Sequence, residues 1–206
     1  MTLAMSFDPK ELERFRAGAE VESEAEKALP DPVRPVSNGR RILSFDQSLS
    51  NTGWAYIEQG RVVETGNIRT EKEDKGHEDN LNRGVAVYIE VEGLFERFEM
   101  GRDTLVVHET PPVGGRMMRP EASLVAATAI RIAAYRRWVP VAMVGAQRAK
   151  KRWTGNGNAK KGAVKEAVLR LHPYLKDLAP MNEAVIDAIA IGLLAAEGHV
   201  IERTGI

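Results

Sequence analysis

Three carboxylates in this sequence occupy places where acidic side chains can do chemistry. Asp46 follows the apolar run 42–45. Glu109 follows the apolar run 104–107 in the same way, so both acids stand at the ends of predicted strands. In open α/β sheets the crevice outside the strand ends is the usual place for ligands. Asp187 lies on a predicted helix among apolar neighbours, where an isolated carboxylate must be neutralised, paired or bound to a cation.

Glu183 is a fourth candidate, because it precedes Asp187 by four residues and so shares its face of the helix. Three or four converging carboxylates suit Mg²⁺ or Mn²⁺, which prefer oxygen ligands, better than zinc. Two such ions about 4 Å apart can activate a water and stabilise the leaving oxygen of a phosphodiester. Taken singly, each acid has a structural explanation: a loop cap for Asp46, a surface strand end for Glu109, a lysine pair for Asp187.

The charged residues balance in number but not in position. Lysine plus arginine and aspartate plus glutamate number 29 each, and this balance by itself argues against nucleic-acid binding. Residues 131–170, however, contain a single acid, Glu166, and a concentration of bases that can create a local field for phosphates. The alternative is an ordinary solvated helix face. The bases are Arg131, Arg136, Arg137, Arg148, Lys150, Lys151, Arg152, Lys160, Lys161, Lys165 and Arg170.

The sequence has no cysteine, which excludes disulfides and thiolate metal sites and suits a reducing compartment. Its most apolar stretch, 124–144, is interrupted by three arginines. The N-terminus lacks the basic and then apolar pattern of a secretory signal. We therefore expect a cytoplasmic protein that does not enter a membrane.

The apolar pattern predicts an α/β domain over residues 40–206, after a polar appendage and proline-rich linker at 1–39. Three strands in an antiparallel meander and two later parallel strands would form a five-stranded mixed sheet flanked by helices. The expected strands are 42–45, 54–57, 62–68, 104–107 and 140–144, and the expected helices are 8–28, 79–100, 121–137, 160–171 and 182–198.

Four segments follow one another in the order of a known set of motifs. The first is a strand ending in Asp46, followed six residues later by Thr52 and Gly53. The segments read ILSFDQSLSNTGW at 42–54, VVHE at 106–109, KKRWTGNGNAKK at 150–161 and NEAVIDAIAI at 182–191. Together they resemble the motifs of the RuvC family of Holliday-junction resolvases and span roughly residues 41–195.

This resemblance implies an RNase H-like fold and a structure-selective endonuclease, in a divergent or phage-type member that serves DNA recombination and repair. It implies a homodimer that holds a four-way junction and nicks two strands symmetrically, leaving a 5′-phosphate and a 3′-hydroxyl. Asp46 would bridge two Mg²⁺ or Mn²⁺ ions, with Glu109 and Asp187 each holding one side. Glu183 would complete the metal shell, and Lys161 would contact a phosphate near the site.

The sequence also departs from the family pattern. Gln47 and Ser48 stand where the family commonly has Pro-Gly, and Ala184 stands where it usually has a second Asp. Glu183, one residue earlier, is our candidate for the missing acid. The loop after Glu109 is longer than in typical members.

Two further segments could contact DNA. One is a glycine- and asparagine-rich turn whose backbone can approach a phosphate; the other is a loop whose methionines could wedge between bases while its arginines hold the backbone. The alternatives are a plain connection between strand and helix, and methionines that cover a dimer contact or the core. The candidates are Lys150, Lys151, Arg152, Thr154, Gly155, Asn156, Gly157, Lys160 and Lys161 in the first segment, and Arg116, Met117, Met118 and Arg119 in the second.

Other functions remain open at this stage. A broader branched-DNA endonuclease would share the same motifs. The segment from Asp46 to Gly53 also resembles the first phosphate motif of actin-like ATPases and sugar kinases, but this chain has room for one such domain and lacks their second phosphate loop. Ala184 could also mark a catalytically inactive DNA-binding module. His108 should point to the opposite face of its strand from Glu109, which makes it a structural residue.

Overall fold

The structure is a computed structural model, and it describes residues 39–73, 77–110, 120–178, 181–199 and 201–203. The appendage predicted at 1–39, with its helix at 8–28, lies outside these residues except for Gly39. The candidate DNA-contacting loop also lies outside them, so its four residues stay predictions: Arg116, Met117, Met118 and Arg119.

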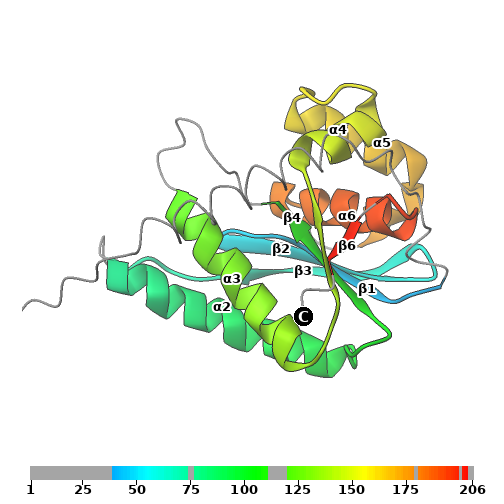
Figure 1. Cartoon of the computed structure of the whole chain (residues 1–206). Helices are drawn as coiled ribbons and strands as arrows, with labels where there is room; N and C mark the ends of the chain where they lie inside the picture. The colour runs from blue at the N-terminus through cyan, green and yellow to red at the C-terminus, as the bar shows by residue number, and fades with distance from the viewer. Residues whose placement is uncertain (1–38, 74–76, 111–119, 179–180, 200, 204–206) are drawn as a thin grey trace, which may run out of the picture. The chain divides into compact units, whose positions relative to one another are not determined.

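The described residues form one mixed sheet with the strand order β3-β2-β1-β4-β5-β6 (Figure 1). β1, β2 and β3 are antiparallel neighbours, β4 and β5 run parallel to β1, and β6 pairs antiparallel with β5. The predicted five-stranded mixed sheet is confirmed, and the edge strand β6 was not predicted. The bounds are β1 Ile42–Asp46, β2 Asn51–Glu58, β3 Arg61–Arg69, β4 Leu105–Glu109, β5 Val141–Val144 and β6 Ile201–Arg203.

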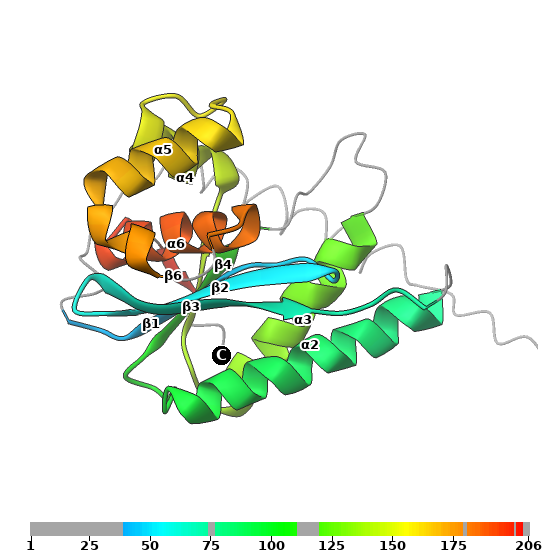
Figure 2. The ribbon, with the colours of Figure 1, turned by 180° about the vertical axis from the view of Figure 1, so that it is seen from behind.

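Helices cover both faces of this sheet, as Figures 1 and 2 show from opposite sides. One face carries α2 (His77–Arg97) and α3 (Pro120–Arg136). The other carries α4 (Ala146–Thr154), α5 (Lys161–Leu171) and α6 (Glu183–Ala196). Among the described residues, no helix combines the length and the apolar character that crossing a membrane requires.

The helices differ from the prediction in two places. The short helix α4 and the 3₁₀ turn η1 (Pro173–Asp177) were both expected to be irregular. Helix α4 was not predicted because it is only nine residues long and strongly basic, and because Ala149 and Trp153 are its only buried residues. Such a pattern is too short to stand out as an amphipathic helix.

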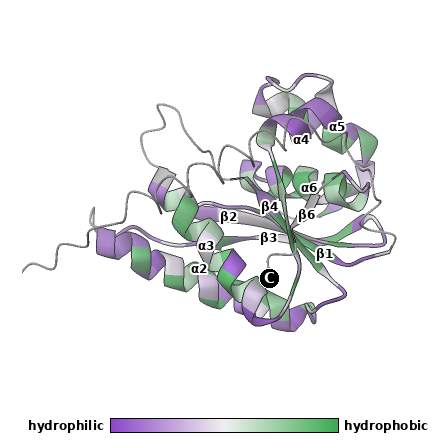
Figure 3. Cartoon of the chain, viewed as in Figure 1, coloured by the Kyte–Doolittle hydropathy of each residue, from purple (hydrophilic) through white to green (hydrophobic). Residues whose placement is uncertain are grey.

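Two apolar cores lie on the two faces of the sheet. β1 contributes to both, since Ile42 packs toward α6 while Leu43 and Phe45 pack toward α2 and α3. A strand buried on both faces reads as a continuous apolar run, which is the pattern that identified β1 in the sequence. In Figure 3, α6, which packs on the sheet, is largely hydrophobic in colour, whereas α4 is largely hydrophilic.

Helix α6 lies unusually close to the sheet. A Cβ atom added at Gly53 would lie 2.2 Å from the backbone carbonyl of Ala184, and one added at Gly192 would lie 2.4 Å from Ser44 Oγ. The Ser44 hydroxyl donates a hydrogen bond of 2.8 Å to the Ala188 carbonyl of α6. Glycine therefore lets the backbone of α6 lie directly against β2 at Gly53 and against the side chains of Ser44 and Ile57 at Gly192.

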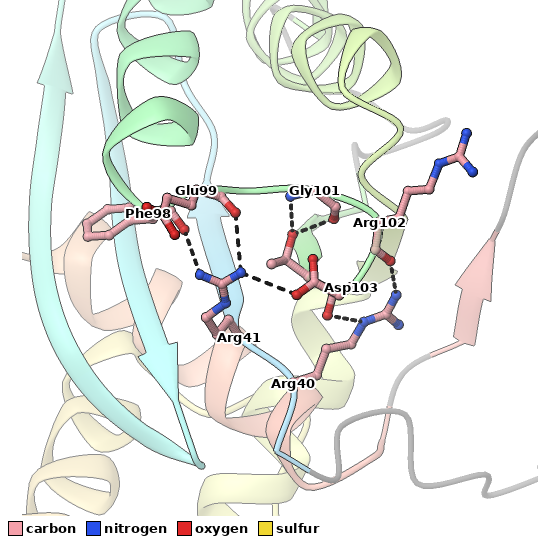
Figure 4. Close-up of polar contacts among 8 residues, drawn as sticks. Arg40, Arg41, Phe98, Glu99, Gly101, Arg102 and Asp103 are labelled. Atoms are coloured by element: carbon pink, nitrogen blue, oxygen red, sulfur yellow. Dashed lines mark hydrogen bonds and ion pairs between the residues drawn. The ribbon is translucent and has the colours of Figure 1, made fainter.

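Two arginines just before β1 bind the chain segment that leads from α2 to β4 (Figure 4). Arg41 donates to the carbonyls of Phe98 and Glu99 just beyond α2, at 3.2 and 3.3 Å. Arg40 donates at 3.2 Å to the carbonyl of Asp103, whose carboxylate pairs with Arg41 at 3.3 Å. These bonds tie the entry to β4 onto β1, so the two strands start together.

Candidate active site

Asp46 and Glu109 end adjacent parallel strands at the same level. The register between β1 and β4 runs from Ile42 opposite Leu105 to Phe45 opposite His108, so Asp46 and Glu109 are the next residues on each strand. Adjacent strands lie about 4.8 Å apart. Because Phe45 faces α2 and α3, strict alternation turns both carboxylates toward α6.

Asp187 reaches the same place from α6. Asp46 pairs with Gly53 of β2, and Gly53 in turn touches the backbone of Ala184. Asp187 lies three residues further along α6, about one helical turn, and its side chain is partly buried. The close approach of α6 at Gly53 is therefore what delivers the third carboxylate to the strand ends.

A pocket of about 220 Å³ lies where these elements meet. Its polar wall consists of Asp46, Glu109, Asp187 and the half-buried Lys150 of α4. Its apolar wall comes from Ala146, Ala149, Val164, Ala190 and Ile191. The structure thus brings together the three acids that the sequence singled out, and it adds Lys150, which the sequence analysis had assigned only to DNA contact.

Glu183 is not among the described residues that line this pocket, and the side chain of Lys161 is not described. Glu183 is the first residue of α6 and is exposed, one turn before Asp187. Lys161 begins α5, three residues before Val164 of the pocket wall, and its side chain is outside what the structure describes. Their catalytic roles therefore stay predictions.

The donor set of the pocket fits a hard divalent cation. Asp46, Glu109 and Asp187 supply only carboxylate oxygens, which are the ligands that Mg²⁺ and Mn²⁺ take. Within the described part of the chain, no three Asp, Glu or His side chains already enclose a point at which a cation could sit.

The turn between α4 and α5 is closed by its own polar groups. Gly155 takes a left-handed conformation with φ of 76° and ends α4. The Thr154 hydroxyl accepts from the Asn156 N–H at 3.2 Å, and the Asn156 side chain accepts from the Asn158 N–H at 2.9 Å. The predicted turn is therefore present, with Gly157 and the exposed Lys160 beyond it.

Arg152 and Trp153 attach α4 to α6. Arg152 makes a bidentate ion pair with Glu197 at 2.8 Å for each bond, and the Trp153 indole N–H donates at 3.0 Å to the Ala190 carbonyl. The guanidinium of Arg152 is therefore already engaged within the protein. Lys150 and Lys151 precede it on the same helix, half-buried and exposed respectively.

His108 lies in the core on the face opposite the pocket, as its place in the strand predicts. Its side chain is fully buried, and its Nδ1 lies 2.8 Å from the Glu109 carbonyl. Burial, together with the smaller effect of the charge of Arg131 and against the opposing effect of that carbonyl, lowers the pKa of His108 to about 4. A neutral imidazole facing a carbonyl must carry its proton on Nδ1. The buried Nε2 atom has no hydrogen-bond partner.

The sequence matches no protein-family model and no curated protein, but the fold matches solved structures. RuvC from Thermus thermophilus is 20% identical with a TM-score of 0.61, over 79% of this chain and 99% of that one. The same RuvC in complex with a Holliday junction substrate gives a TM-score of 0.62 at the same identity and coverage. The yeast mitochondrial Holliday junction resolvase Ydc2 is 14% identical with a TM-score of 0.52, over 80% of this chain and 81% of that one. The chain therefore has the RNase H-like fold of the resolvases, as expected from the motifs.

His108 should make the free energy of unfolding depend on pH. Its folded pKa of about 4 lies below the ordinary value of 6.5, so its contribution is complete above pH 6.5 and is lost as the pH falls from 6.5 toward 4. Between pH 7.5 and pH 5 the parent protein should lose about 2 kcal/mol through this residue. Urea unfolding of the parent and of His108→Gln at both pH values measures the effect, and equal losses would contradict it.

Proposed function

We propose that this protein is a metal-dependent endonuclease that cuts branched DNA, and four-way junctions in particular. One observation carries the proposal: Asp46, Glu109 and Asp187, from three separate elements, line one pocket at the ends of parallel strands. The fold supports it as well, because it is shared with two resolvases, one of them in complex with a Holliday junction substrate.

The chemistry is hydrolysis of a phosphodiester that leaves a 5′-phosphate and a 3′-hydroxyl. Two Mg²⁺ or Mn²⁺ ions, when bound, would supply an activated water and stabilise the leaving oxygen. Asp46 lies beside Glu109 at the ends of two adjacent strands, and its pair Gly53 contacts α6, the helix that carries Asp187. Asp46 is therefore the residue suited to serve both ions. Glu109 and Asp187 would each hold one ion.

The remaining residues of the site would position the DNA strand. The ammonium of Lys150 in the pocket wall can neutralise a phosphate that approaches the three carboxylates. The helices α4 and α5, which contribute Ala149 and Val164 to the pocket wall, carry further exposed bases that can hold the neighbouring backbone. Those in described positions are Arg148, Lys151, Lys160, Lys165 and Arg170.

A homodimer would present two such sites to one junction, and the face formed by α2 and α3 suits a second copy. Each helix exposes an apolar stripe: Leu81, Val85 and Ile89 on α2, Leu124 and Ile132 on α3. The stripes border a groove of about 400 Å³ that is almost entirely apolar. The ion pair of His77 with Glu121 joins the starts of α2 and α3, so the two helices run in the same direction. Such a pair can pack on its symmetry mate as a four-helix layer, in which each copy buries the same stripes of the other.

Replacing Asp46 should separate DNA binding from cutting. Asp46→Asn keeps the shape of the side chain but removes the charge, so nicking of a four-way junction in Mg²⁺ should fall by about a thousandfold or more. Affinity for the junction should stay within about twofold, because the bases of α4 and α5 are unchanged. Asp177→Asn, an exposed acid on η1, is the matched control and should cut normally.

The nicks should be mapped on a four-way junction, a fork, a flap and a linear duplex. Paired symmetric nicks on the junction alone support a resolvase. Cutting of all the branched forms would replace it with a broader endonuclease. Normal cutting by Asp46→Asn would eliminate the proposed site, and binding without any cutting by the parent protein would indicate an inactive DNA-binding module.

Glu183→Gln tests whether the site has a fourth acid. If Glu183 helps hold a cation across the turn from Asp187, its neutralisation should lower the rate about tenfold or more and raise the Mg²⁺ requirement. Steady-state nicking at a series of Mg²⁺ concentrations measures both. Cutting equal to that of the parent protein would leave the cluster with three working members.

The dimer surface can be tested with one added charge. Val85→Glu places a carboxylate in the centre of the α2 stripe, where burial against a second copy would leave it unpaired, so the variant should be monomeric at micromolar concentration. Val63→Glu is the matched control, because Val63 on β3 is also an exposed valine, at 50% exposure, and lies outside the α2 and α3 stripes. The same charge at Val63 should leave the dimer intact. Light scattering after gel filtration gives the mass, and a dimeric Val85→Glu would rule out this surface.

A further inference from the structure

The side chain of Gln47 forms two hydrogen bonds with the backbone of Glu109. Its Nε2 donates to the Glu109 carbonyl at 2.7 Å, and its Oε1 accepts from the Glu109 N–H at 3.1 Å. The amide can be placed in only one orientation, because the reverse would set oxygen against oxygen and N–H against N–H. Gln47 is 6% exposed, so water does not compete readily for these bonds.

These bonds lie where the backbone ladder stops. The pairing of β1 with β4 ends at Phe45 opposite His108, so Asp46 pairs with Gly53 of β2 and Glu109 with Val144 of β5, but not with each other. Without a further link the strand ends could separate at the level of the two carboxylates. The Gln47 amide replaces the next backbone pair between β1 and β4, and its hydrogen bonds join the residue after Asp46 to Glu109.

The backbone around Glu109 is held from the other side as well. The His108 imidazole also lies within hydrogen-bonding distance of the Glu109 carbonyl, and the Thr110 N–H donates to the Val144 carbonyl of β5 at 2.9 Å. Gln47 and His108 together thus satisfy a carbonyl that lies at the edge of the pocket. Movement of the Glu109 carboxylate is left to its own side-chain torsions.

We propose that Gln47 is a positioning residue that sets the separation of the Asp46 and Glu109 carboxylates for a divalent cation. It does not contact the cation, and its effect passes through the backbone of Glu109. The inference rests on the proposed function only in naming that cation. The RuvC motif commonly has proline at this position, and proline could form neither hydrogen bond. The two bonds therefore depend on the glutamine by which this chain departs from the motif.

The loop that carries Gln47 is held by hydrogen bonds of its own. A substitution can therefore remove the two hydrogen bonds from Gln47 to the Glu109 backbone, here called the clamp, without removing the others. The Ser48 N–H donates to Thr52 Oγ1 at 3.1 Å, and the Thr52 hydroxyl donates to the Ser48 carbonyl at 2.6 Å. The buried Arg83 donates at 2.8 Å to the Ser50 hydroxyl. Gln47→Met keeps the length of the side chain and loses both hydrogen bonds. Gln59→Met, at the exposed β2–β3 turn, is the matched control.

The first measurement is amide hydrogen exchange in the metal-free protein, followed by NMR. In Gln47→Met the Glu109 amide should exchange about fivefold faster or more relative to the Val107 amide on the same strand, because one buried hydrogen bond is lost. Gln59→Met should leave the ratio unchanged. An unchanged ratio in Gln47→Met would overturn the clamp, whatever the protein does to DNA.

The second measurement is Mn²⁺ binding to the DNA-free protein, followed by the electron paramagnetic resonance signal of free Mn²⁺. Gln47→Met should raise the Kd about tenfold, as is usual when a residue that orients a ligand is lost. Faster exchange with an unchanged Kd, or no Mn²⁺ binding by the parent protein, would overturn the positioning role. Tight Mn²⁺ binding by a parent protein that cuts no DNA would refute the proposed nuclease and leave the clamp standing.

Discussion

The candidate site depends first on how closely α6 approaches the sheet. At Gly53 no side chain lies between α6 and β2, at Gly192 the helix meets the side chains of Ser44 and Ile57, and the Ser44 hydroxyl bonds the helix backbone across the contact. A methyl group at Gly53 would meet the backbone of Ala184 and would have to push the helix or the strand aside. Since Asp187 is carried by α6 while Asp46 is carried by β1, such a shift would change the distance between two carboxylates rather than only loosen the core.

Much of the site could be predicted because it follows from short-range rules. Asp46 and Glu109 each end an apolar run, and strand ends in α/β sheets meet at one edge. Asp187 was identifiable as an acid within an apolar helix. The place of Lys150 in the pocket wall was not predicted, because it depends on α4, a helix for which the sequence has no clear pattern. α4 is held by Trp153 and Arg152 reaching residues far along the chain, which no local pattern reveals.

Gln47 shows the same limit more sharply. In the sequence it was only a departure from a motif, and an amide side chain after a strand has no distinctive periodicity. Its two bonds to Glu109 span 62 positions of the sequence and exist only once β1 and β4 are paired. The three-residue strand β6 is a comparable case, since so short an edge strand is defined by its partner β5 and not by its own residues.

The basic residues of α4 and α5 belong to a chain whose charges sum to zero. A chain without net charge exerts no net Coulomb attraction on a distant polyanion. Beyond the screening length of about 8 Å in physiological salt, the bases of α4 and α5 are largely screened as well. Within that length, these bases would turn their side of the protein toward the phosphates of the proposed DNA substrate. Charge arranged in this way governs the orientation of an encounter more than its frequency.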